Sequence, residues 1–220
     1  PGQKDLKVDF SWQNDKFKVI KTYIFNDSNY AVKVLYKVTN LTKNNLTTRL
    51  YGQFNQTEQL HKKGLLSSYT SFVGAVLSTK DNHYQKQAFK KMASSPINVT
   101  SVGGWAAMIQ HYFVTAWVPD QKSQNQFYTQ SSGGSDPTYS AGVAGPDVTI
   151  KAGETKTLSA MLFAGPAISS QLSALAPHLD LTVDYGWLWF IGKILFWILS
   201  LFHKVVFNWG CSIILLTLLI

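Results

Sequence analysis

The chain has 220 residues, a single cysteine (Cys211), and 20 lysines and arginines against 12 acidic residues. This length accommodates one large domain with a terminal segment, and one cysteine excludes an internal disulfide framework. Only one of the 20 cationic residues is an arginine, Arg49, and the lysines are scattered. Nucleic-acid readers usually cluster arginine with lysine on one face, so no nucleic-acid partner is predicted. The positive charge is instead consistent with attraction to an anionic membrane surface, or with lysines on the solvent-exposed face of a sheet.

The first 54 residues predict an antiparallel meander of four strands separated by short polar turns. Apolar and polar side chains alternate in each segment, which is typical of a strand with one face in the core and one in water. The expected strands are residues 6–12, 17–25, 32–38 and 46–54.

The middle of the chain continues the strand pattern, with two long stretches expected as loops, residues 55–68 and 118–147. Exposed strand edges and these loops are where a partner would dock. Further strands are expected at 69–77, before Met92, within the apolar stretch 101–119 as two strands or one bent strand, at 138–145, and on both sides of a hairpin turn at Gly153-Glu154. The Gly-rich segment 131–137 is expected to be a linker.

Helical spacing first appears at residues 167–176, where a short helix is predicted that Pro177 ends. Together the segments amount to roughly ten to twelve mostly antiparallel strands, which favours a large β-sandwich closed by this helix. We therefore expect a mainly β domain over residues 1–176 and a connector at 177–185. The connector candidates are Pro177, Asp180, Asp184 and Gly186.

Residues 186–206 predict an amphipathic helix that lies at a membrane interface. Between 187 and 202 almost nothing is polar except Gly192, Lys193 and Ser200. Such a 16-residue helix is about 24 Å long, shorter than the roughly 30 Å hydrocarbon core. Tryptophans beside lysines are typical of a helix in the headgroup layer. The candidate membrane-interface residues are Trp187, Trp189, Phe190, Lys193, Phe196, Trp197, Phe202, Lys204 and Trp209.

Asn208 and Gly210 interrupt this pattern, and a largely apolar run without charged residues follows up to Ile220. We expect 210–220 to be the truncated start of a transmembrane helix whose remainder would follow Ile220. The competing interpretation is a buried core helix followed by a buried strand, since Trp and Phe are also core residues.

No pattern of catalytic or metal-binding residues emerges from the sequence. The five histidines have no metal-ligand spacing, and neither a nucleophile elbow nor a phosphate-binding Gly loop is present. Asp180 and Asp184 could pair as acid and base, but they suit a solvated connector close to a helix start better. Five Asn-x-Ser/Thr triplets are equally compatible with turns and receive no role. We predict no enzymatic activity, no metal and no cofactor.

Several long strings of the sequence resemble the YidC family of bacterial membrane protein insertases. They are HLDLTVDYGWLWFI (178–191), FNWGCSIILLT (207–217), GGWAAMIQHYFVTAWVP (103–119) and YAVKVLYKVTN (30–40). The resemblance implies a galactose-mutarotase-like β-supersandwich in the periplasm, followed by a helix along the periplasmic face of the inner membrane and by the insertase core. The groove arginine of that core would lie beyond Ile220, so no groove residue is assigned here.

The resemblance further implies that this chain is a non-catalytic part of an insertase and chaperone. Its role would be to anchor the insertase core at the membrane and to dock to partner proteins. The whole protein would help nascent inner-membrane proteins insert and fold, alone or with the Sec translocon including SecD–SecF. A hydrated groove shortens the costly passage of polar groups through hydrocarbon, without ATP or a covalent step.

Two other classes remain open. A membrane-tethered carbohydrate-binding or sugar-epimerase-like sandwich would need a polar cleft that holds Glu58 or Glu154 against His61, His83 or His111. A viral or eukaryotic secreted glycoprotein stem is the third possibility, for which a single cysteine is unusual.

Overall fold

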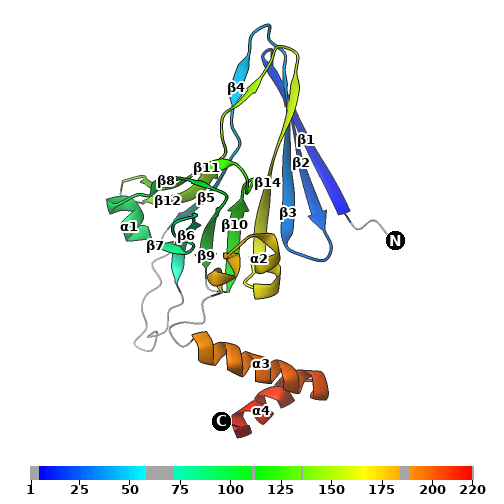
Figure 1. Ribbon diagram of the computed structural model, residues 1–220, viewed down its shortest axis with the longest axis vertical. Coiled ribbons are helices and arrows are strands. Elements are labelled where there is room, and N and C mark those ends of the chain that lie inside the picture. Colours follow the sequence, from blue (N-terminus) through cyan, green and yellow to red (C-terminus); the bar gives the residue numbers. More distant parts are fainter. Residues whose placement is uncertain (1–4, 58–71, 111, 135, 184–188, 220) are drawn as a thin grey trace. The chain divides into compact units, whose positions relative to one another are not determined.

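Two sheets that pack face to face form the first part of the molecule (Figure 1). The computed structural model describes residues 5–57, 72–110, 112–134, 136–183 and 189–219. The chain divides into two compact units, Pro1–Val183 and Asp184–Ile220, called here the sandwich unit and the helical unit. Each unit is described by itself.

The large sheet has eight strands in the order β1-β2-β3-β14-β10-β9-β6-β7, the small sheet has the order β5-β12-β11-β8, and β13 pairs with β4. All the pairings are antiparallel. The strands are β1 (Asp5–Gln13), β2 (Phe17–Asn26), β3 (Ala31–Asn40), β4 (Leu46–Thr48), β5 (Tyr51–Thr57), β6 (Val73–Ser78), β7 (Gln85–Gln87), β8 (Asn98–Val102), β9 (Trp105–Gln110), β10 (Phe113–Val118), β11 (Gln124–Ser132), β12 (Thr138–Ala144), β13 (Val148–Ile150) and β14 (Thr155–Pro166). The prediction of a mainly β antiparallel sandwich followed by C-terminal helices is confirmed.

The first three strands of the predicted meander are confirmed, but the fourth is wrong. Residues 46–54 divide between β4 and β5 in different sheets, and β14 takes the place beside β3. The fully buried Asn40 explains the change of direction. Its amide donates to the carbonyls of Asn44 (2.7 Å) and Ile150 (3.0 Å), and its oxygen accepts from the Thr42 amide (2.9 Å). These bonds fasten the turn after β3 to the end of β13.

The turn at Gly153-Glu154 is present, yet the strands on either side of it do not pair with each other. Gly153 has a φ of +72°, and its amide donates to the Asn40 carbonyl. The short β13 pairs with β4, and the long β14 pairs with β3, so the predicted hairpin is wrong. A turn signal does not determine the partner of the strand that follows it.

The predicted loop at 118–147 contains two strands of the small sheet: β12 matches the strand expected at 138–145, whereas β11 was not predicted. Asn125, Phe127 and Thr129 alternate as buried residues of β11, and the Asn125 amide donates to the carbonyls of Asp120 (2.9 Å) and Ser123 (3.0 Å). Polar residues that are buried and hydrogen-bonded conceal the apolar alternation of a strand. The predicted linker at 131–137 includes Gly133, which turns β11 back into β12 with a φ of +91°.

Helix α1 (Phe89–Ser94) and strand β7 occupy the stretch for which only a short strand was predicted before Met92. Of the two alternatives for 101–119, two strands or one bent strand, the structure has the first, since β9 and β10 are separate strands that form a hairpin. Most of the predicted loop at 55–68 and the start of the strand at 69–77 lie outside the described residues, since β5 reaches Thr57 and β6 begins at Val73.

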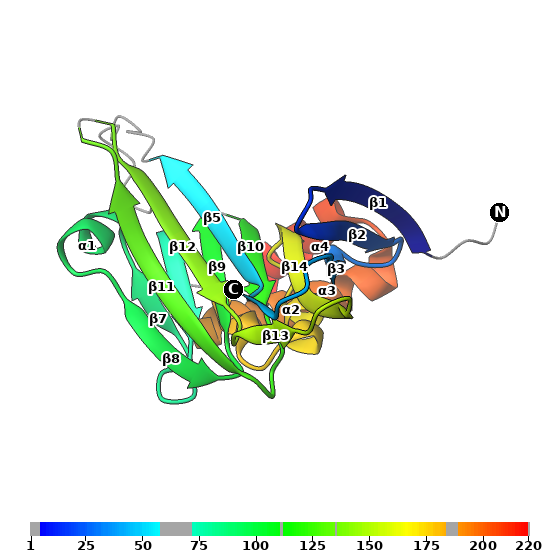
Figure 2. The same cartoon turned by 90° about the horizontal axis from the view of Figure 1, so that it is seen from above.

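The core has two layers, one on each side of the large sheet. Between the sheets, residues of β6 and β9 pack on β11, β12 and α1, as Leu77 does on Phe127 and Met92 on Met108. On the opposite face, α2 (Ser169–Leu175) and the 3₁₀ turn η1 (Leu179–Thr182) cover β9, β10 and β14. Figure 2 shows the small sheet lying over β6, β9 and β10, while β1–β3 extend beyond it.

The helical unit contains α3 (Trp189–Val206) and α4 (Trp209–Leu219), which contact each other. Among the described residues, no helix combines the length and the apolar character needed to cross a membrane.

Candidate functional site

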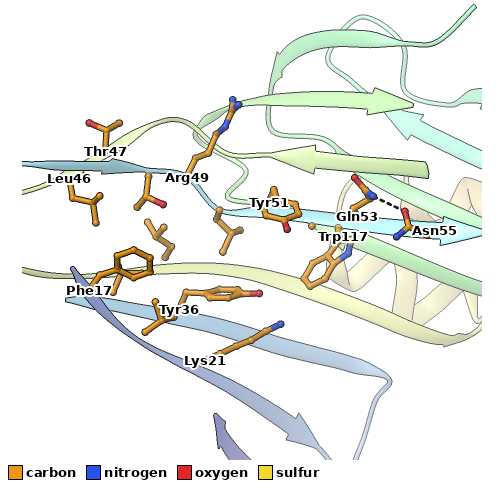
Figure 3. A pocket seen from close by; sticks show the side chains of 16 residues that line it. Phe17, Lys21, Tyr36, Leu46, Thr47, Arg49, Tyr51, Gln53, Asn55 and Trp117 are labelled. Atoms are coloured by element: carbon orange, nitrogen blue, oxygen red, sulfur yellow. Dashed lines mark hydrogen bonds between the residues drawn. The ribbon is translucent and has the colours of Figure 1, made fainter. Parts of the chain in front are cut away.

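A groove of about 690 Å³ opens between the two sheets where the small sheet ends (Figure 3). One wall comes from β2 and β3, the other from the segment that includes β4 and β5, and Trp117 of β10 lies at one end. The residues lining the groove are Phe17, Val19, Lys21, Tyr36, Val38, Leu46, Thr47, Thr48, Arg49, Leu50, Tyr51, Gly52, Gln53, Asn55, Trp117 and Leu158.

The charged groups of the groove are cationic. The Lys21 ammonium lies 4.8 Å from the Tyr23 ring centroid and 5.0 Å from that of Tyr36. Burial lowers the pKa of Lys21, but hydrogen bonds with the Tyr23 and Tyr36 hydroxyls outweigh it, so this pKa lies above the ordinary value. No carboxylate or imidazole belongs to the described residues that line the groove. The described lining of the groove therefore offers aromatic and cationic contacts.

A hydrogen-bonded set of polar side chains holds the β5 wall in place. The Tyr128 hydroxyl donates to Gln53 Oε1 (2.8 Å), and Gln53 Nε2 donates to Asn55 Oδ1 (2.6 Å). Burial raises the pKa of Tyr128. Beside this set, the Trp117 indole lies directly against Gly52, where a Cβ would overlap the ring. Only glycine allows the strand and the indole to approach so closely.

The residues of the epimerase hypothesis do not come together in the described part of the chain. Glu154 accepts from the Lys151 amide (2.8 Å) in the turn before β14. His83 stacks on His178 with ring centroids 4.0 Å apart. Glu58, His61 and His111 lie outside the described residues. No group of three or more potential metal ligands is found among the described residues.

The predicted connector is held firmly against the sandwich in its first half. The fully buried Trp105 indole donates to the Pro177 carbonyl (3.0 Å), and Leu179 is fully buried beside it in the core. Asp180 lies in η1, whereas Asp184 and Gly186 lie outside the described residues. The sandwich unit thus reaches Val183, and part of the predicted connector belongs to its core.

The described membrane-interface candidates lie in α3 and at the start of α4. Phe196, Trp197 and Trp209 each expose half or more of their surface, Lys204 is exposed, and Phe202 is half-buried. Trp189, Phe190 and Lys193 belong to the first turns of α3, and Trp187 lies outside the described residues. The aromatic residues that can be placed therefore lie mainly at the surface of the helical unit.

The corner between α3 and α4 includes an aromatic residue that the sequence did not single out, Phe207. Its φ is +54°, and it exposes 83% of its surface. Next to it, Asn208 caps α4 by accepting from the Gly210 amide (2.8 Å), and Trp209 stacks on His203 with centroids 3.9 Å apart. The signal that could have found Phe207 is its place directly after a helix end, where glycine is expected.

Comparison with known proteins shows relatives over the full length of the chain. A family model for the YidC periplasmic domain matches residues 1–198. The chain is 39% identical to the membrane protein insertase YidC of Aeromonas hydrophila subsp. hydrophila over 222 residues, covering 100% of this chain and 40% of that protein. It is 43% identical over 219 residues to the protein of the same name from Nitrosococcus oceani, covering 99% of this chain and 39% of that one. The predicted family resemblance is confirmed, and the chain spans about two fifths of the length of these relatives.

The sandwich also resembles a solved structure of low sequence identity. A galactose mutarotase-like protein from Lactobacillus casei superposes with a TM-score of 0.50 at 10% identity, covering 74% of this chain and 71% of that one. At this level of identity the likeness concerns the fold alone, and it carries no activity with it.

Proposed function

Since the chain belongs to the YidC periplasmic domain family, we propose that it forms the periplasmic region of an inner-membrane insertase. The sandwich unit stands in the periplasm, and the helical unit lies at the outer boundary of the bilayer. The whole protein assists nascent inner-membrane proteins during insertion and folding, and this chain contributes anchoring and docking. The proposal assigns no catalytic step, metal or cofactor to the chain.

The surface of the helical unit is the observation that carries this proposal. Large apolar side chains of α3 and α4, including Trp197 (66%) and Ile214 (60%), remain exposed. Soluble surfaces rarely gather so many large apolar side chains on adjoining elements. Between Tyr185 and Ile220 the sequence contains two lysines and no acidic residue. Aromatic residues combined with a positive charge match the boundary of an anionic bilayer.

Vesicle binding tests the anchoring role. We expect the whole chain to float with vesicles that contain phosphatidylglycerol, and its tryptophan emission to shift to the blue. Replacing Lys193 and Lys204 with Glu should weaken flotation at low salt, because each basic residue contributes about 1 kcal/mol near an anionic surface. The matched control is Lys33→Glu with Lys37→Glu, the same charge change on exposed residues of β3. A chain that stays unbound with an unshifted spectrum contradicts the anchoring role.

Docking to the Sec translocon, including SecD–SecF, belongs to the same proposal and would use a terminal strand of a sheet. In the described parts of the two larger sheets these strands are β1 and β7 of the large sheet and β5 and β8 of the small sheet. A photo-crosslinking residue placed in turn at Ser11, Gln85, Tyr51 and Asn98 samples all four. A crosslink to purified SecD–SecF from one strand alone is expected, and no crosslink from any strand rejects this route of docking.

A further inference from the structure

The corner of the helical unit combines an unusual backbone conformation with an unusually exposed side chain. Helix α3 ends at Val206, and the Phe207 amide donates to the His203 carbonyl (2.8 Å), closing the last turn. This position requires the left-handed conformation, which glycine adopts freely and other residues adopt at a cost. A bulky residue with positive φ is a genuine outlier. Phe207 is such a residue, with a φ of +54°.

The side chain of Phe207 does not account for the corner's own stability. The end of α3 is closed by a backbone amide that any residue except proline would supply. The start of α4 is capped by Asn208, whose Oδ1 accepts from the amides of Gly210 (2.8 Å) and Cys211 (3.3 Å). With 83% of its surface exposed, the Phe207 side chain is nearly free of packing. Folding alone would therefore favour glycine at this position.

The surroundings of Phe207 point to a lipid surface as its binding partner. Val205 and Trp209, on either side, expose 72% and 50% of their surfaces. The stacking of Trp209 on His203 fixes one of these neighbours in place. Lys204 is exposed three residues before Phe207, and no acidic residue occurs between Tyr185 and Ile220 to repel an anionic headgroup. The corner thus combines exposed apolar side chains with an exposed lysine three residues before Phe207.

We propose that Phe207 inserts into the boundary between headgroups and acyl chains of an anionic bilayer, at the point where the chain turns from α3 into α4. This inference rests on the proposed membrane contact of the helical unit and names the side chain that enters deepest at the corner. The unfavourable backbone conformation is retained because inserting the ring into lipid is more favourable in free energy than the gain in folding stability that glycine would give.

Two substitutions separate the backbone effect from the ring effect. Phe207→Gly removes the ring and relieves the backbone, so its melting temperature should equal or exceed that of the parent chain. Phe207→Ala removes the ring but keeps the unfavourable conformation, so it should not gain stability. Both should weaken partition into vesicles of phosphatidylethanolamine and phosphatidylglycerol by roughly tenfold, the order expected for burial of a phenyl ring. Phe207→Leu should retain most of the binding.

The matched control is Phe113→Ala, which removes an aromatic side chain of the sandwich unit with an exposure of 60% and should leave partition unchanged. If the parent chain itself does not bind vesicles, the proposed function fails. If the parent chain binds and Phe207→Gly binds equally well, only the present inference fails. Loss of self-association in Phe207→Gly, with vesicle binding intact, would show that the ring contacts a second copy of the chain and would overturn the inference.

Spin labelling gives an independent measure of depth that does not depend on affinity. Cys211 is the only cysteine, so Phe207→Cys with Cys211→Ser carries one nitroxide. On addition of the same vesicles, collisions with oxygen should rise and collisions with a water-soluble nickel chelate should fall. A label that remains equally accessible to the nickel chelate in vesicle-bound protein excludes insertion at this corner.

Discussion

The two halves of the large sheet share one alternation of side chains and differ in what covers them. In the half made by β14, β10 and β9, both faces are packed, and Trp105 and Phe163 are almost completely buried. In the half that begins at β1, the same alternation leaves Leu6, Phe10 and Trp12 with more than half of their surfaces exposed. Figure 2 shows that β1 and β2 extend beyond the small sheet.

This difference shows which features of the sheet a sequence pattern can predict locally and which depend on tertiary packing. The register places Phe25 opposite Val32, and Tyr23 opposite the buried Val34, so that the inner row of side chains continues from one half to the other. Alternation fixes which face each residue takes. It does not fix whether another layer lies on that face, and the groove forms where the covering layer ends.

The largest expected effect on stability comes from a comparison of two tryptophans, one in each half of the large sheet: Trp105 in β9 and Trp12 in β1. Trp105→Ala should lower the free energy of unfolding by about 3–5 kcal/mol, because it empties a fully buried site. It also removes the hydrogen bond to the Pro177 carbonyl. Trp12→Ala should cost no more than about 1 kcal/mol, since 55% of this side chain is already in water. Urea unfolding of both variants measures the contrast, and equal costs would mean that the two halves are equally covered.

The next effect tests how far along the chain the core of the sandwich unit extends. Leu179 is fully buried, whereas Leu181, two residues later in η1, exposes 44% of its surface. Leu179→Ala should therefore destabilise by about 2–5 kcal/mol, and Leu181→Ala by less than about 1 kcal/mol. Denaturant midpoints that move equally would place Leu179 in a solvated connector. A chain shortened to Leu175 should also be unstable, because it lacks Leu179.

The sequence predicted the fold class, most strands and the C-terminal helices, because these depend on local alternation and on helical spacing. It did not predict that β14 would lie beside β3, because that pairing depends on hydrogen bonds of Asn40 to residues over a hundred positions away. It missed β11 because Asn125 and Thr129 are polar yet buried. Phe207 follows directly after the predicted helix end, where glycine is expected, but its positive φ and its exposure become apparent only in the structure.

A smaller effect is expected at the groove, where the halves meet. In Gly52→Ala the new Cβ would overlap the Trp117 indole, so the ring must move away from the strand. Such overpacking typically costs about 1–3 kcal/mol. The control is Gly134→Ala, where a Cβ meets no atom within 4 Å and the free energy of unfolding should stay nearly unchanged. If Gly52→Ala is neutral, the indole does not pack on the strand as described.

The smallest effect on stability is expected on the uncovered half itself. Replacing Leu6 and Phe10 with Ser should change the free energy of unfolding by less than about 1 kcal/mol, because both side chains are mostly in water. The matched control is Val34→Ser, in the same inner row but fully buried, which should destabilise strongly since it places an unpaired hydroxyl in the core. Light scattering should show less self-association for the double variant, because it loses exposed apolar surface on β1, which is a terminal strand of the large sheet among the described residues. A large loss of stability in the double variant would show that another part of the polypeptide covers this face, and the contrast between the two halves would then disappear.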